Sequence, residues 1–140
     1  MEFGKYIEIF NHEVVPALGC TEPIAVALAV ATSTKHLGKP VERAEIFLSG
    51  NIMKNGVGVG IPGTGMVGLH IAAALGITGG DCSKELEVLN SVTKDQIIAA
   101  KELVKKGVIK ISIKEKVDKL YIEATCFNGS NQARTLICGS

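Results

Sequence analysis

The spacing of hydrophobic residues predicts two helices at the start of the chain. Between residues 3 and 15, apolar side chains recur at near-helical intervals, so we expect an amphipathic helix over 3–15 that ends before Pro16. Residues 22–37 form a second helical pattern, which is rich in alanine and apolar nearly all round. Such a helix is usually buried on most sides. Gly38 and Pro40 mark where it ends.

The middle of the chain combines a strand, a glycine-rich segment and a short helix. Strict alternation predicts a strand over 43–48. The next segment, 49–68, contains seven glycines and one proline, which is too glycine-rich for a regular element. The apolar run 69–75 predicts a buried helix closed by Gly76, and His70 within it is expected to be a core histidine.

The last part of the chain changes from helix to strand. Further helices are predicted over 83–90 and 93–106, the second with Thr93 as its cap. Three alternating segments then predict strands over 108–114, 120–127 and 133–138, and Asn128-Gly129 is a turn signal between the last two. The predicted fold class is α+β, with helices packed on a small, largely antiparallel sheet and one long glycine-rich loop.

Composition narrows the classes of function. The 140 residues correspond to about one domain, and 15 basic against 14 acidic residues give a net charge of +1. That balance, with only 4% aromatic residues and no tryptophan, indicates no nucleic-acid or membrane partner. We expect a cytoplasmic protein, because the N-terminus lacks the pattern of a signal peptide and no apolar run approaches the ~20 residues needed to span a bilayer.

One cysteine stands directly before a predicted helix. The stretch 17–29 reads ALGCTEPIAVALA, so Cys20 precedes a helix that Thr21 could cap and that carries Pro23 in its first turn. The positive end of the helix dipole favours a thiolate there, the form that attacks electrophiles and binds metals. Glu22 could serve as a nearby acid or base. The alternative is a thiol packed in the core, as free cysteines often are.

The glycine-rich segment has two possible functional roles. It matches G-x-G-x-x-G twice, starting at Gly58 and at Gly63, but the preceding strand is too distant and no suitable acidic residue follows, which argues against a dinucleotide site. A small ligand fits better, because the glycines let backbone N–H groups approach it and polar side chains could bind a carboxylate or an amine. A tight structural loop is the other alternative. The candidate polar residues are Asn51, Lys54, Asn55 and Thr64.

The remaining candidates are weaker. Cys126 and Cys138 lie inside predicted strands, so we expect them in the core, whereas Cys82 at a predicted helix start should be more exposed. His12 and His36 are expected on helix surfaces. No Ser–His–Asp or H-E-x-x-H pattern occurs, so a triad hydrolase or a zinc protease has no support.

Three motifs, taken in order, resemble a known family. ALGCTEPIAVALA, SGNIMKNGVGVGIPGTG and GLHIAAALG are similar to the N-terminal part of the L-cysteine desulfidase family, which is related to the α-chain of iron–sulfur-dependent L-serine dehydratases. The resemblance runs over essentially all of residues 1–140. It implies a lyase with a [4Fe–4S] cluster and no pyridoxal phosphate. Such an enzyme eliminates sulfide from L-cysteine, or water from L-serine, and yields pyruvate and ammonia.

The resemblance also implies roles for individual residues. Cys20 would be a cluster ligand, and Lys54 would lie in the substrate pocket. We expect Lys54, together with Glu22 beside Cys20, to be catalytic. The substrate pocket would be lined by Asn51, Asn55, Gly63, Thr64 and Gly65. Cys82, Cys126 and Cys138 do not match the ligand positions of the family.

The family departs from this chain in length. Its members are about three times as long, with the other ligand cysteines in the C-terminal part. We therefore expect an N-terminal domain or fragment that is inactive alone, needs the missing C-terminal part and could self-associate through exposed apolar surface. Two alternatives stay open: a self-contained small-ligand or anion-binding module, and a purely structural domain.

Overall fold

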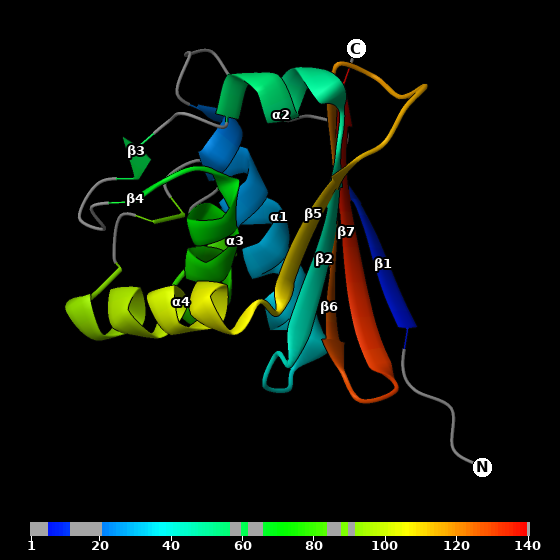
Figure 1. Ribbon diagram of the computed structural model, residues 1–140. Helices are drawn as coiled ribbons and strands as arrows, with labels where there is room; N and C mark the ends of the chain where they lie inside the picture. The colour runs from blue at the N-terminus through cyan, green and yellow to red at the C-terminus, as the bar shows by residue number, and fades with distance from the viewer. Residues whose placement is uncertain are drawn as a thin grey trace.

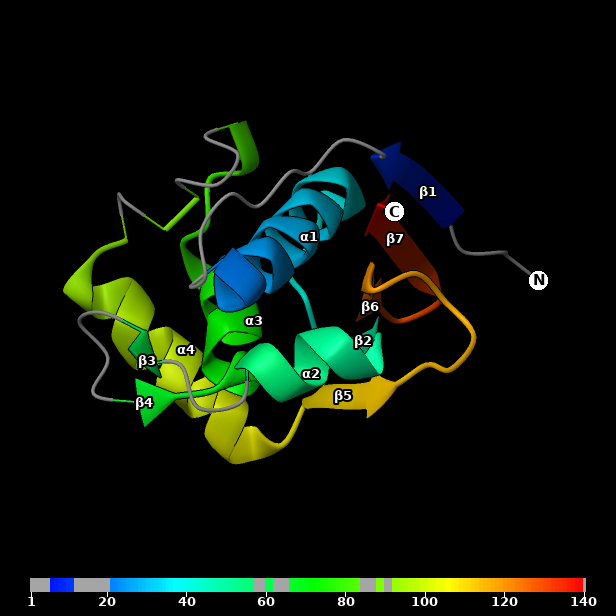
Figure 2. The ribbon, with the colours of Figure 1, turned by 90° about the horizontal axis from the view of Figure 1, so that it is seen from above.

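The computed structural model describes residues 6–11, 21–56, 60–61, 66–83, 88–89 and 92–139. A five-stranded sheet is covered on one face by α1, with α3 packed on α1 and α4 packed on α3 (Figure 1). The short helix α2 crosses one end of the sheet (Figure 2). In chain order the elements are β1 (Tyr6–Asn11), α1 (Thr21–Leu37), β2 (Arg43–Leu48), α2 (Gly50–Gly56), β3 (Gly60–Ile61), β4 (Met66–Val67), α3 (Leu69–Thr78), α4 (Lys94–Lys106), β5 (Ile109–Ile113), β6 (Leu120–Asn128) and β7 (Asn131–Gly139).

The sheet is antiparallel at its centre and parallel at both edges. Its strand order is β1-β7-β6-β2-β5, and β3 pairs with β4 in a separate ribbon. Strand β6 runs antiparallel to β7 and to β2, whereas β1 is parallel to β7 and β5 is parallel to β2. The β6–β7 hairpin turns at Gly129, which has φ +57° at the first loop position, where a type II′ turn needs it. The α+β class is confirmed, and the sheet is mixed.

The core lies between α1 and the inner face of the sheet. Helix α1 is buried nearly all round from Ala25 to Ala31, as its apolar sequence predicted. Ser33 brings two polar contacts into this layer: its hydroxyl donates to the carbonyl oxygen of Ala124 at 2.8 Å and lies 2.6 Å from the hydroxyl of Thr135. The sheet residues that face α1 and α3 alternate along each strand: Ala44, Ile46, Leu48, Ile122, Ala124, Cys126, Ala133, Thr135 and Ile137.

Several predicted elements are confirmed. The helix over 22–37, the strand over 43–48 and the three final strands form close to their predicted bounds. Helix α4 begins with a capping box in which the Thr93 side chain accepts from the backbone N–H of Gln96, and the Gln96 side chain accepts from the N–H of Thr93. Gly107 ends the helix with φ +71°.

The predicted helix over 3–15 is wrong where the structure describes it. Tyr6–Asn11 is strand β1, which pairs in parallel with β7. The six residues YIEIFN include two isoleucines, a tyrosine and a phenylalanine, and β-branched and aromatic residues favour strands. Pairing with a strand distant in sequence therefore outweighed the near-helical spacing. Residues 3–5 and 12–15 lie outside the described part of the chain.

The segment 49–68 contains regular structure despite its glycines. Helix α2 forms because Ser49 caps it: the Ser49 hydroxyl accepts from the N–H of Ile52 at 3.1 Å and donates to the carbonyl oxygen of Lys119. Strands β3 and β4 pair through Gly60–Val67 and Ile61–Met66. The prediction of no regular element was therefore wrong. The capping serine of α2 and the short β3–β4 hairpin give this segment regular structure despite its high glycine content.

Helix α3 runs past its predicted end. It continues to Thr78 and is closed by Gly79, whose N–H donates to the carbonyl oxygen of Leu75. Gly76 lies inside the helix and against α1 instead of at the helix end. The sequence predicted that Gly76 ends the helix, but in the structure its lack of a side chain allows α3 to pack closely against α1.

The predicted helix over 83–90 is wrong for the residues that the structure describes. Ser83 lies in a short 3₁₀ turn and Val88–Leu89 lies in a turn. Asp81 holds this bend, since its carboxylate accepts from the N–H and hydroxyl of Ser83 while its own N–H donates to the carbonyl oxygen of Val88. Residues 84–87 and 90 lie outside the described part. Among the helices described, none has the length and apolar character needed to cross a membrane.

Candidate functional site

Helices α1 and α3 pack closely and run parallel. A Cβ on Gly76 would come within 2.6 Å of the carbonyl oxygen of Ala27, and one on Gly80 would meet the Cβ of Ala31 at 3.0 Å. Gly80 follows the end of α3 and meets a later residue of α1 than Gly76 does, so the two helices point the same way, as Figure 1 also shows. Their positive N-terminal ends therefore lie at the same end of the molecule.

Helix α2 lies at that same end. The N-terminal end of α1 lies close to the C-terminal end of α2 in both views, and the two helices are in contact (Figures 1 and 2). Asn51 and Lys54 are exposed on α2 and three residues apart, so they share one side of it. The Lys54 ammonium makes no ion pair or hydrogen bond with other described residues.

The other predicted site residues are placed only in part. Glu22 is the second residue of α1, and Asn55 belongs to α2, but their side chains are not described. Pro23 occupies the first turn of α1, as predicted, and it is buried. Cys20, Gly63, Thr64 and Gly65 lie outside the described residues, as does His12. Their predicted roles stay predictions.

His70 was assigned to the core, and the structure corrects this. It is the second residue of α3 and is exposed, while its neighbours Leu69 and Ile71 are buried. The helix turns this one position away from the core. His70 therefore joins the end of the molecule where α1, α2 and α3 meet. The polar residue at the start of an otherwise apolar helix was the signal in the sequence. His36, predicted on a helix surface, is indeed exposed.

The described cysteines do not form a ligand set for a metal cluster. Within the described ranges, no three His, Cys, Asp or Glu side chains gather in an arrangement that could hold a metal ion. Cys126 is fully buried near Thr34 and Val30, and burial raises the pKa of its thiol to about 11, which disfavours the thiolate that ligates iron. Cys82 and Cys138 are half-buried on separate elements. Cys126 is thus a core residue as predicted, and Cys138 is only half-buried.

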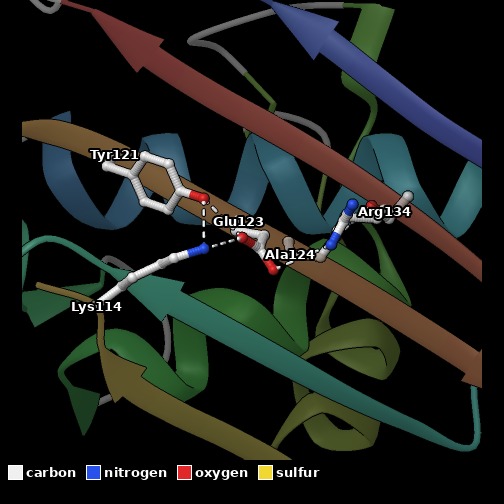
Figure 3. Close-up of polar contacts among 6 residues, drawn as sticks. Lys114, Tyr121, Glu123, Ala124 and Arg134 are labelled. Atoms are coloured by element: carbon white, nitrogen blue, oxygen red, sulfur yellow. Dashed lines mark hydrogen bonds and ion pairs between the residues drawn. The ribbon is translucent and has the colours of Figure 1, made fainter. Parts of the chain in front are cut away.

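A cluster of polar side chains lies on the face of the sheet that is turned away from α1. Figure 3 shows Lys114, Tyr121, Glu123 and Arg134 in front of the strands, with the helices behind them. The Glu123 carboxylate accepts from the Tyr121 hydroxyl at 2.6 Å and from the Lys114 ammonium at 3.3 Å, and it lies 3.5 Å from the Arg134 guanidinium. The Glu123 side chain is only 11% exposed.

The electrostatics of this cluster favour an ionised Glu123. Burial would raise the pKa of Glu123, but the hydrogen bonds from Tyr121 and Lys114 and the charges of Lys114 and Arg134 outweigh burial and lower it. Burial and the hydrogen bond to Glu123 raise the pKa of Tyr121, so its hydroxyl stays protonated. Sequence reasoning missed this cluster, although the alternation in β6 already placed Tyr121 and Glu123 on one face.

Sequence comparisons show curated relatives that share one name. A UPF0597 protein of Parabacteroides distasonis is 52% identical over 134 residues, which cover 96% of this chain and 31% of the relative. The UPF0597 proteins of Oleidesulfovibrio alaskensis and Aeromonas salmonicida are 46% and 49% identical, over 97% and 98% of the chain and 32% and 31% of their own lengths. No family model and no solved structure matches the chain. Nearly all of the chain is therefore similar to about a third of each of these UPF0597 proteins. The name UPF0597 states neither a reaction nor a ligand.

Proposed function

We propose that this chain is the N-terminal part of an iron–sulfur-dependent lyase that eliminates sulfide from L-cysteine or water from L-serine, and that it works in the cytoplasm. The observation that carries the proposal is the parallel packing of α1 and α3. It directs two helix N-termini to the end where α2 exposes Asn51 and Lys54. The helices that meet there belong to the motifs that resemble the L-cysteine desulfidase family.

The charge distribution at this end suits an amino-acid carboxylate. Two parallel helix dipoles give a positive potential at their shared N-terminal end, and the Lys54 ammonium adds a formal charge. Parallel helix dipoles repel each other, and the close packing of α1 and α3 at Gly76 offsets this repulsion. In this proposal Lys54 and Asn51 orient the carboxylate together with Asn55 and the segment Gly63–Gly65.

Cys20 is the cluster ligand that this chain would supply. It directly precedes the first residue of α1, where the helix dipole favours a thiolate. The other ligands would come from the C-terminal part of the longer protein, because the described cysteines do not suit the role. When bound, such a cluster would supply an open iron that acts as a Lewis acid.

The reaction needs a base for the α-proton and an acid for the leaving group. Glu22, Lys54 and His70 belong to the elements that meet at this end, and they are our candidates. The base takes the α-proton, and the leaving group departs from the β-carbon with a proton from the acid. The enamine that results hydrolyses to pyruvate and ammonia.

The test is anaerobic reconstitution with iron and sulfide of residues 1–140 alone and of the longer protein. We expect bound iron, visible charge-transfer absorbance and pyruvate release only with the longer protein. Cys20→Ala should abolish all three, whereas the matched control Cys82→Ser should preserve them. A stoichiometric cluster on residues 1–140 alone, or full activity in Cys20→Ala, would refute the proposal.

A second comparison separates substrate binding from cluster assembly. In the longer protein, Lys54→Met should raise the KM for amino acid at unchanged iron content. Lys106→Met, which removes an exposed lysine at the end of α4, should not. Binding of an amino acid to residues 1–140 that Cys20→Ala leaves intact, without any lyase activity in the longer protein, would instead favour a simple ligand-binding module.

A further inference from the structure

One face of the sheet is not covered by any described helix. We call it the outer face: the side turned away from α1, formed by alternate residues of β2, β5, β6 and β7 (Figures 1 and 2). Glu123 lies at its centre, with Phe47 opposite it on β2 and Leu136 opposite it on β7. The other described residues of the outer face are Arg43, Glu45, Lys110, Ser112, Lys114, Tyr121, Thr125, Phe127, Gln132, Arg134 and Cys138.

The outer face is not a simple solvated surface. Glu123 and Thr125 are 9% and 8% exposed, although none of the described helices covers this face. A cavity of about 740 Å³ opens on this side, lined by Phe47, Ile113, Lys114, Glu115 and Glu123.

The charges of the outer face indicate what should cover it. Among its described side chains, the cations are Arg43, Lys110, Lys114 and Arg134, and the carboxylates are Glu45 and Glu123, so these described side chains carry a net positive charge. Glu45 pairs with Arg43, and Glu123 pairs with Lys114 and Arg134. The apolar residues Phe47 and Leu136 lie between these groups. A complementary partner therefore has an apolar centre and a border of carboxylates.

We propose that the outer face of the sheet is the docking surface for the C-terminal part of the longer protein. This inference rests on the proposed function, which requires that part to complete the site. The chain matches about a third of each relative, so the relatives have twice as much polypeptide that must pack somewhere. The docked part meets Phe47 and Leu136 with apolar side chains and meets Lys110 with a carboxylate.

The test measures association of residues 1–140 with the separately produced C-terminal part, in the absence of iron. Leu136→Lys places a charge in the apolar centre, and Lys110→Glu reverses a charge at the edge without touching the Glu123 cluster. We expect each to weaken binding by about tenfold or more. The matched controls on α4, Ile98→Lys and Lys101→Glu, make the same changes at exposed positions and should leave binding unchanged.

Cysteine labelling gives a second measurement that needs no variant. Cys138 lies on the outer face and Cys82 on the helical side, and both are half-buried. In residues 1–140 alone both should react with a maleimide, read site by site by mass spectrometry. In the longer protein Cys138 should be protected while Cys82 keeps its reactivity.

The outcomes separate this inference from the proposed function. Cys20→Ala should leave the association intact while it abolishes the cluster. Loss of lyase activity alone would therefore not contradict the proposed docking surface. Unchanged binding by both outer-face variants, or equal labelling of Cys138 in both proteins, would overturn the inference. A homodimer of residues 1–140 that Leu136→Lys dissociates, and that persists in the longer protein, would overturn it in favour of a second copy.

Discussion

Gly76 lies so close to Ala27 that a methyl group at position 76 would come within 2.6 Å of the carbonyl oxygen of Ala27. The contact involves backbone and cannot be relieved by a side-chain rotation. It fixes how closely α1 and α3 approach, and it keeps their N-terminal ends together. The same residue thus connects core packing to the geometry of the candidate site.

Replacing Gly76 with alanine should destabilise the protein. Overpacking of a tight core position costs about 1–3 kcal/mol, which outweighs the gain in helix propensity. Urea unfolding followed by circular dichroism measures the change. Gly50→Ala is the matched control, because its Cβ would meet nothing within 4 Å. We expect that control to be neutral or slightly stabilising, and equal effects at both positions would contradict this account of Gly76.

The hydroxyl pair Ser33 and Thr135 should behave as one unit. Ser33→Ala leaves the buried Thr135 hydroxyl without its partner, and an unsatisfied buried polar group costs about 1–3 kcal/mol. Thr135→Val should cost a similar amount. The double variant should lose less unfolding free energy than the two single variants together, because both partners are then removed. Additive losses in a double-mutant cycle would show that the two hydroxyls act independently.

Glu123 should make stability depend on pH. Its hydrogen bonds and ion pairs lower its pKa in the folded protein, so its contribution is present above the pKa of the unfolded chain. That contribution is lost as the pH falls through the lower, folded-state pKa. Glu123→Gln should therefore be destabilising at neutral pH and should flatten the decline in unfolding free energy at acidic pH. Glu102→Gln on α4, an exposed carboxylate, should change neither, and parallel pH curves for Glu123→Gln and the unsubstituted protein would refute the assignment.

His70 should matter for turnover in the longer protein if the proposed lyase function holds. It is exposed at the start of α3, at the same end as α2 and the start of α1. His70→Gln should lower kcat for pyruvate release by about 10²-fold or more, the usual contribution of general acid–base catalysis, at unchanged iron content. His36→Gln removes an equally exposed histidine from the far end of α1 and is the control. Full activity in His70→Gln would remove His70 from the candidate bases.

The helical core was the most predictable part of the fold. The continuous apolar run of α1 and the Thr93–Gln96 capping box are local signals, and the structure contains both elements where they were expected. The alternation in β2 and in the three C-terminal strands was equally local. By contrast, YIEIFN supported helix and strand alike, and only its pairing with β7 decided between them.

The candidate site, like the fold, could be predicted from the sequence only in part. The sequence by itself determined the chemical groups: the cysteine before a helix start, the polar residues of α2 and the alternation in β6. Only the tertiary structure decided that α1 and α3 run parallel, that His70 faces outward, and that Glu123 meets Lys114, Tyr121 and Arg134. The physical reason is the separation in sequence of the residues that interact. Caps and periodicity act between residues a few positions apart. Helix direction and cross-strand contacts depend instead on partners that the chain brings together only when it folds.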